Sequence, residues 1–285
     1  MRELKILLIV IIFTGITYWG VEPLAHSVFH PHTPDADYTF KDVDGLNGVK
    51  GDASKGAEIA TNCIGCHSIK SAGFEAPMSA NDAAATYGVV PPDLSTAAKI
   101  YDHNYLAAFI KNPAVASKVA HKFDGVNKVH PMPGYDYLGN EAIADLIAYL
   151  GSIAPKDISA KAVFEDACSR CHSMKYAKIS STTQVDVVSK YMGSTPPDLS
   201  MMIRSRGDEY LHKFINDPQK LLHGTSMPRV GLTKESEEKV VEFMTQTGDS
   251  KKDERESLGP KVLMYLAILA VFAYLWKVKI WREVH

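Results

Sequence analysis

The chain has 285 residues, 46% of them hydrophobic and 22% charged, and its formal net charge is −2. This is the composition of a globular protein with length for about two domains. A charge so close to zero argues against a nucleic acid as the partner.

The N-terminus begins with an apolar stretch. Residues 6–21 carry no charge and follow Arg2 and Lys5. We expect residues 1–25 to form a signal-anchor or transmembrane helix. A cleavable signal peptide is the alternative, but Pro23 lies close to where a cleavage site would need small residues.

A linker is expected over residues 26–49. It opens with three histidines, His26, His30 and His32. We favour a polar segment beside the membrane over a metal site for them.

A short helix over Asp52–Thr61 is expected to lead into Cys63, Cys66 and His67. A C-x-x-C-H run is typical of covalent haem attachment, because its two thiols can add to the vinyl groups of one haem while the histidine ligates the iron. We therefore expect Cys63 and Cys66 to bind haem c and His67 to be an iron ligand.

The same motif recurs at Cys168, Cys171 and His172, and the two copies use all four cysteines of the chain. The cofactors we expect are therefore two covalently bound haem c groups. Zinc would need four ligands brought to one metal, whereas each cysteine pair here has its own histidine. A thioredoxin-like site needs one copy in a βαβ setting, and disulfides would leave the histidines unexplained.

The two motifs belong to an internal duplication. Residues 87–95 and 192–200 share Pro-Pro-Asp-Leu-Ser at an offset of 105, which is also the offset between the motifs (168 − 63 = 105). The segments that begin at His130 (His-Pro-Met-Pro-Gly) and Thr225 (Thr-Ser-Met-Pro-Arg) align at an offset of 95 (227 − 132 = 95). The duplication predicts two similar domains in tandem.

The chain is expected to be mainly α-helical, because few alternating β patterns occur. We place the two domains at 50–154 (the first repeat) and 159–248 (the second repeat). Further helices are expected at 159–167, at 105–112 ended by Pro113, at 140–150 between an Asn140 N-cap and Gly151, and after an N-cap at Thr233. A helix at each end of a haem unit, with a methionine loop before the last helix, resembles the class I cytochrome c fold.

Each iron needs a sixth ligand if it carries electrons and binds no substrate. Met132 and Met227 each precede a proline, in a loop before the last helix of their repeat. We expect Met132 to ligate the first iron and Met227 the second, which raises the reduction potential relative to ligation by two histidines. His130 and His223 are the competing ligands.

The Pro-Pro-Asp-Leu-Ser segments are expected to act through their backbone. A carbonyl at Pro92 or Pro197 can accept the Nδ1 proton of the proximal histidine and fix its tautomer. Asp93 and Asp198 are expected to cap the next helix, the alternative being a plain helix-entry turn. Arg206 is assigned to the second haem's environment as a partner for a propionate, against the alternative of a solvated helix face.

The C-terminus is the second apolar end. Residues 262–276 carry no charge, and the stretch reaches membrane-spanning length over 258–281 if flanking lysines extend to the interface. A buried core helix is the alternative, but the stretch is apolar on all faces. The basic residues that follow predict a cytoplasmic C-terminus. Because covalent haem attachment takes place outside the cytoplasm, we expect the haem domains on the periplasmic side of a bacterial inner membrane.

The second repeat and the C-terminus together resemble cytochrome c1, the membrane-anchored haem subunit of quinol–cytochrome c oxidoreductase. The resemblance is carried by Cys168-Ser-Arg-Cys-His-Ser-Met-Lys-Tyr, Pro196-Pro-Asp-Leu-Ser followed by Arg206, Met227, and one apolar C-terminal helix with a basic tail. The tandem arrangement is similar to the dihaem cytochrome c1 variants of some bacteria.

This resemblance implies a subunit of a dimeric cytochrome bc complex. Electrons would arrive from the Rieske iron–sulfur subunit beside cytochrome b and leave to a cytochrome c or an oxidase. No acid–base or nucleophilic template is convincing, so we expect no catalytic residue and no enzyme activity of the chain on its own. The alternatives are a dihaem subunit of a haem–copper oxidase, a free-standing anchored carrier and, from another class, a dihaem peroxidase with an open iron face.

Overall fold

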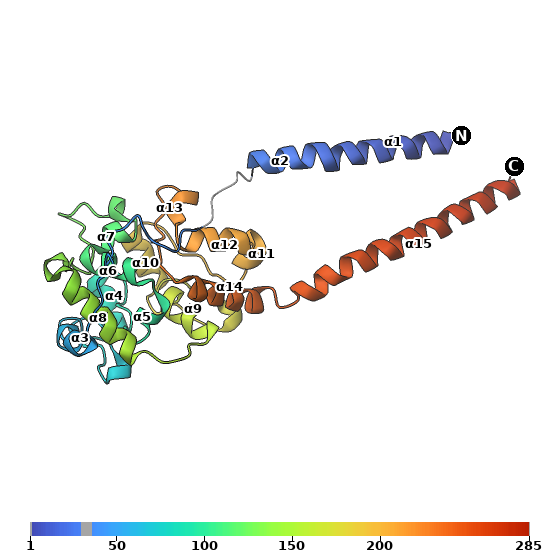
Figure 1. Cartoon of the computed structure of the whole chain (residues 1–285). Coiled ribbons are helices and arrows are strands. Elements are labelled where there is room, and N and C mark those ends of the chain that lie inside the picture. The colour runs from blue at the N-terminus through green and yellow to red at the C-terminus, as the bar shows by residue number, and fades with distance from the viewer. Residues whose placement is uncertain (1, 30–35, 285) are drawn as a thin grey trace. The chain divides into compact units, whose positions relative to one another are not determined.

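The computed structural model describes residues 2–29 and 36–284, and these residues are mainly helical. Within them β pairing is limited to three isolated bridges, so no sheet is formed. The prediction of a mainly α protein is thereby confirmed. The chain divides into two compact units, Met1–Asp37 and Tyr38–His285 (Figure 1).

The N-terminal unit is one helical rod. Helix α1 (Arg2–Ile16) and helix α2 (Glu22–Phe29) are joined by a π-helical turn at Thr17–Val21. Residues 3–28 are long and apolar enough to cross a membrane. Because residues 26–29 are helical, the predicted start of the linker is too early: His26 belongs to α2, while His30 and His32 lie outside the described residues.

The first repeat contains six helices among the described residues: α3 (Ala53–Ala60), α4 (Ala80–Tyr87), α5 (Ala97–Ile100), α6 (His103–Lys111), α7 (Pro113–Ala116) and α8 (Gly139–Ile153). Single 3₁₀ turns occur at Lys70–Ala72, Ala120–Lys122 and Asp136–Leu138. The side chain of Asp52 caps α3 by accepting a hydrogen bond from the Ser54 N–H group at 2.9 Å.

Helix α3 packs against helix α8 (Figure 1). The contact depends on Gly56, because a Cβ at this position would lie 1.9 Å from the carbonyl oxygen of Asp145. A glycine in the middle of a helix lowers helix stability, and here it allows the close approach of the two backbones.

The predicted ends of α8 are wrong. A 3₁₀ turn over Asp136–Leu138 runs directly into the helix through Gly139, whose φ of +72° suits only glycine. Asn140 is therefore a residue of the first turn and not the N-cap. The helix also continues past Gly151 to Ile153.

The described part of the second repeat also contains six helices: α9 (Ala160–Cys168), α10 (Val185–Met192), α11 (Met202–Arg206), α12 (Asp208–Ile215), α13 (Pro218–Leu221) and α14 (Lys234–Gly248). A 3₁₀ turn lies at Lys175–Ala177. The predicted cap at Thr233 is present, since its side chain accepts from the Ser236 N–H group, and Ser159 caps α9 by accepting from the Ala162 N–H group. Helix α9 packs against α14 as α3 packs against α8.

The two repeats share buried residues. Ile100, from the first repeat, is buried in the core cluster formed mainly by the second repeat, and Tyr101 packs against the cores of both. Backbone bonds join the same region, since the Asp102 N–H group donates to Gly231 O at 2.9 Å and the Thr233 N–H group to Ile100 O at 3.0 Å. The division into two domains near residues 154–159 stays a prediction.

The chain ends in one long helix, α15 (Lys252–Val284), of 33 residues. It begins before the predicted start at Leu258, and Pro260 lies inside it. Its apolar stretch is long enough to cross a membrane and is not buried within the structure. A buried core helix, the alternative considered for this segment, is thereby excluded.

Candidate haem sites

The first attachment motif, residues 63–67, is a tight turn at the end of α3. The N–H groups of Cys66 and His67 both donate to the carbonyl oxygen of Cys63, at 3.1 and 2.9 Å. A bond from residue i+4 back to residue i places His67 one helical turn above Cys63. The motif can therefore present two thiols and an imidazole to one planar ligand.

The second attachment motif, residues 168–172, repeats this geometry at the end of α9. Cys171 and His172 donate to the carbonyl oxygen of Cys168 at 3.2 and 3.0 Å. The same backbone turn therefore follows the entry helix of each repeat.

All four cysteines are free thiols. Burial raises the pKa of Cys63, raises that of Cys168 to about 12, and also raises that of Cys171. Burial therefore favours the neutral thiol form of these three cysteines. Among the described residues no three His, Cys, Asp or Glu side chains gather as a metal cage, so the zinc alternative has no ligand set.

Each proximal histidine is held by a proline carbonyl. Nδ1 of His67 donates to Pro92 O at 2.8 Å, and Nδ1 of His172 donates to Pro197 O at 2.8 Å. Burial lowers the pKa of both imidazoles, which keeps them neutral. With Nδ1 protonated and engaged, the lone pair of Nε2 is left as the one that can bind a metal.

The aspartates of the proline segments have a role that differs from the predicted one. Asp93 accepts from the backbone and the hydroxyl of Ser95, and Asp198 accepts from the Ser200 N–H group at 3.0 Å. Asp198 also binds the Ser173 hydroxyl at 2.8 Å. These carboxylates therefore close a turn and tie it to the segment after the histidine, and they do not cap helices.

The two candidate distal methionines lie in matched loops. Met132 is half-buried and packs against the core of the first repeat, and its N–H group donates to Nδ1 of His130 at 3.2 Å. Met227 is half-buried too, and its N–H group donates to the Thr225 hydroxyl at 3.3 Å. In both loops a side chain two residues before the methionine fixes its backbone.

The competing histidines are placed differently. Nδ1 of His130 is occupied by the backbone of Met132, and its ring contacts those of Phe109 and Phe123 at centroid distances of 6.1 and 5.1 Å. His223 is exposed. Neither arrangement favours these histidines over the methionines as iron ligands.

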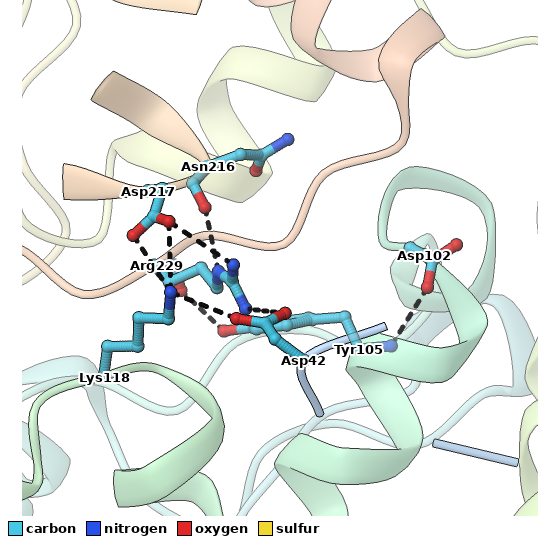
Figure 2. A network of polar contacts seen from close by, with 7 residues as sticks. All are labelled: Asp42, Asp102, Tyr105, Lys118, Asn216, Asp217 and Arg229. Atoms are coloured by element: carbon cyan, nitrogen blue, oxygen red, sulfur yellow. Dashed lines mark hydrogen bonds and ion pairs between the residues drawn. The ribbon is translucent and has the colours of Figure 1, made fainter. Parts of the chain in front are cut away.

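A buried arginine anchors the loop of the second methionine (Figure 2). Arg229 is 3% exposed, and its Nε donates to Asn216 O at 2.9 Å while Nη1 donates to Asp42 Oδ1 at 2.9 Å. Its backbone is held as well, because the Tyr105 hydroxyl donates to Arg229 O at 2.6 Å and the Arg229 N–H group donates to Ser117 O at 2.8 Å. Groups from both repeats therefore fix the residue two positions after Met227.

Two further charges complete this network. Lys118 contacts Asp217 at 3.0 Å and Asp42 at 3.1 Å, and Asp217 also lies 3.7 Å from Arg229 Nη2 (Figure 2). Burial pushes the pKa of Asp42 upward, but the hydrogen bonds and charges of Arg229 and Lys118 outweigh it and hold the pKa below its ordinary value. Because Asp42 is 187 residues from Arg229 in sequence, no local pattern indicated this network.

An arginine inside the second motif was not among the predicted site residues. Arg170 is half-buried, and its Nε is buried without a hydrogen-bond partner. The predicted Arg206 is exposed and lies over the Tyr210 ring, 5.4 Å from its centroid. The signal that could have pointed to Arg170 is its contrast with Gly65, which occupies the matching position of the first motif (170 − 65 = 105).

The residues present fit a covalent haem at each motif. Each site offers two unpaired thiols, an imidazole with a free Nε2, and a half-buried thioether in a fixed loop. When bound, haem c supplies an iron that changes between the ferric and ferrous states. The protein side of both sites is compatible with that group.

Comparison with known proteins agrees with this chemistry. The family model described as Cytochrome c matches residues 53–154, and the model described as Cytochrome C1 family matches residues 232–284. No curated protein matches the chain. A solved chain titled "Hyperthermophilic respiratory Complex III" is 22% identical over 44% of this chain and 75% of its own length, with a TM-score of 0.34, which does not by itself establish a shared fold.

Proposed function

We propose that the chain is a cytochrome c1-like, c-type cytochrome that carries two covalently bound haems, one in each repeat. The matches to the Cytochrome c and Cytochrome C1 family models support this assignment. Cys63 and Cys66 bind the first and Cys168 and Cys171 the second. His67 and Met132 are the iron ligands of the first site, and His172 and Met227 those of the second.

The observation that carries this proposal is the pair of proximal hydrogen bonds. In each repeat the imidazole Nδ1 donates to a proline carbonyl at 2.8 Å, 25 residues along the chain. A hydrogen bond of this kind fixes the tautomer, orients the ring and makes Nε2 a better donor. A histidine that served only the core would not need the same partner twice, beside the same pair of free cysteines.

The distal methionines suit a carrier of electrons. A thioether opposite the imidazole raises the reduction potential relative to a second histidine and leaves no coordination position for a substrate. The reduced protein is therefore expected not to bind carbon monoxide. Rapid formation of a carbon monoxide complex at one haem would favour the peroxidase alternative.

The terminal helices support a membrane location for the chain. Residues 3–28 and α15 are long and apolar enough to span a bilayer. Lys277, Lys279 and Arg282 near the end of α15 favour a cytoplasmic C-terminus, with both haem repeats on the periplasmic side of a bacterial inner membrane.

We infer that the chain works within a dimeric quinol–cytochrome c oxidoreductase. It takes electrons from the Rieske iron–sulfur subunit, which works beside cytochrome b, and passes them to a cytochrome c or an oxidase. The support is the cytochrome C1 match over residues 232–284, which include the last helix of the second repeat and the C-terminal anchor.

Purification of the full chain from its own membranes in mild detergent tests this assignment. Recovery of a b-type cytochrome and a Rieske protein in fixed ratio with the chain is expected. Recovery with a copper-containing oxidase alone, or as a free-standing carrier, would overturn it. A chain that lacks α15 is the matched control, because it keeps both repeats and loses the C-terminal anchor, which makes up most of the region that the Cytochrome C1 family model matches.

A further inference from the structure

The two attachment motifs differ in charge at one inner position. The second has Arg170 between its cysteines, where the first has Gly65. Within the described residues no ion pair or hydrogen bond engages the Arg170 guanidinium, and its Nε is buried. A buried N–H donor without an acceptor is unfavourable, so the Arg170 Nε calls for an acceptor that the polypeptide does not supply.

The backbone of Arg170 is tied to the first repeat. Its carbonyl accepts from the Thr183 N–H group at 3.1 Å, and the Thr183 hydroxyl accepts from the Val90 N–H group at 3.0 Å. Thr183 is fully buried. Val90 lies two residues before Pro92, whose carbonyl binds His67. One threonine therefore links the second motif to the loop that holds the first proximal histidine.

Two other contacts keep this region of the repeats together. The Thr96 hydroxyl donates to Asp166 at 2.6 Å. Gly88 has a φ of +77° and lies against the Tyr191 ring so closely that a Cβ would be 2.3 Å from it. The position of Arg170 next to the first site is thus set by several contacts.

The charge of Arg170 also reaches the first repeat. Burial is the main cause that raises the pKa of Tyr101 and Tyr105, and the positive charge of Arg170 acts against it. Tyr105 belongs to α6 and Tyr101 packs against the cores of both repeats. The guanidinium therefore lies close to the first repeat, although its backbone belongs to the second.

We propose that Arg170, although carried by the second motif, binds a propionate carboxylate of the haem in the first repeat. This inference depends on the proposed presence of two haems. The planar fork of arginine matches a carboxylate with two parallel hydrogen bonds. Gly65, at the matching place in the first motif, offers no charge to either haem.

The chemistry of haem c identifies which haem Arg170 serves. The thioether bonds form at the vinyl edge of the porphyrin, and the propionates leave from the opposite edge. A side chain between the two cysteines of a motif therefore lies at the wrong edge of its own haem. A haem in the first repeat would be the neighbour that Arg170 could serve, because its proximal loop is linked to the second motif through Thr183.

As a consequence, the reduction potential of the first haem depends on a residue of the second repeat. A positive charge beside the first haem, paired with its propionate, disfavours the oxidised iron. Replacing Arg170 with Gln removes that charge and leaves the carboxylate uncompensated, so the potential of the first haem should fall. The potential of the second haem should change less.

The test uses the full chain with its haems, purified in detergent, and follows both haems by spectroelectrochemical titration. Met132→His and Met227→His assign the potentials, because each replaces one thioether by an imidazole and lowers one potential. The variants are Arg170→Gln and Arg170→Lys. Lys161→Gln is the control, because Lys161 is an exposed cation on α9 whose contact with Glu165 is 3.6 Å.

We expect Arg170→Gln to lower the reduction potential of the first haem, which Met132→His identifies. Arg170→Lys should lower this potential less, and Lys161→Gln should change neither potential. The propionate bending band in the resonance Raman spectrum should shift in Arg170→Gln alone. The proposal would be overturned if Arg170→Gln lowered only the potential of the second haem, which Met227→His identifies. An equal fall in both potentials, or no change in either, would overturn it too.

Peptide mass analysis keeps the test decisive if Arg170→Gln takes up haem poorly. Loss of the haem on Cys63 and Cys66 supports the proposal, and selective loss of the haem on Cys168 and Cys171 overturns it. The intact mass of the unaltered chain separates this question from the proposed function. Fewer than two haems there would refute the function, whereas two haems with an unchanged first potential in Arg170→Gln would refute only the role of Arg170.

Discussion

Replacing Arg229 with methionine is expected to destabilise the repeats by about 3 kcal/mol. Breaking a buried ion pair by removing one partner costs about 3–5 kcal/mol. Arg229 is 3% exposed and binds the buried carbonyl of Asn216 at 2.9 Å, and a buried acceptor left without a donor accounts for about 1–3 kcal/mol of the loss.

The expected loss is at the low end of the range for two structural reasons. The Asp42 side chain is 45% exposed, so solvent screens its bond to Arg229 and that bond contributes less. Lys118 still contacts both Asp42 and Asp217 after the substitution, at 3.1 and 3.0 Å. Neither carboxylate is therefore left without a cation.

Urea unfolding of the purified full chain measures the effect. The three tryptophans, Trp19, Trp276 and Trp281, lie in the terminal helices, so circular dichroism and haem absorbance should replace tryptophan fluorescence. With a urea dependence of about 1–3 kcal/mol per molar, the midpoint should fall by roughly 1–3 M. The Met–iron charge-transfer band expected from the proposed ligation by Met227 should weaken as well, because Arg229 fixes the Met227 loop.

The matched control is Lys239→Met, which removes the partner of the exposed Glu235 on α14. Pairs of this kind contribute about 0–1 kcal/mol. An Arg229→Met midpoint no lower than that of Lys239→Met would refute the assigned role of the network.

The pH dependence of the Arg229→Met effect has a definite sign. The pKa of Asp42 is below its ordinary value of 3.8 in the folded chain. A lowered carboxyl pKa contributes stability that is present above the unfolded value and is lost as the pH falls through the folded value. The stability difference between the parent chain and Arg229→Met should therefore be constant near neutral pH and shrink below about pH 4.

Thr183→Val should lower stability by about 1–3 kcal/mol in urea unfolding, because it leaves the Val90 N–H group without its acceptor. Thr183→Ser keeps the hydroxyl and should recover most of this loss. Equal losses of stability in the two variants would contradict this role of Thr183. Gly56→Ala should destabilise by about 1–3 kcal/mol or more, since its Cβ would meet Asp145 O at 1.9 Å. In Gly151→Ala the nearest atom to the new Cβ would be 3.9 Å away, so this variant should be neutral or stabilised by up to about 1 kcal/mol. A melting temperature of Gly56→Ala above that of Gly151→Ala would contradict the close packing of α3 on α8.

Features set by local sequence were predictable. The caps at Asp52, Ser159 and Thr233 follow from side chains that bind backbone groups two or three residues ahead. The proximal hydrogen bonds were predictable too, because the repeat doubled a short segment whose prolines restrict its backbone.

Features that depend on distant parts of the chain were not predictable. Arg229 meets Asp42 only because residues far apart in sequence fold together, and nothing local to either residue indicates a partner. Ile100 belongs to the core of the other repeat although its own helix pattern is unremarkable. The misplaced start of α8 had a local cause, because Gly139 and the preceding 3₁₀ turn compete with Asn140 for the helix entry.

The central claim is that each repeat holds its own covalent haem, and the intact mass of the purified chain tests it most directly. We predict the polypeptide mass plus two haems in the parent chain, and plus one haem in both Cys63→Ala/Cys66→Ala and Cys168→Ala/Cys171→Ala. A parent chain with one haem or none, or a double variant whose haem content is unchanged, would contradict the account.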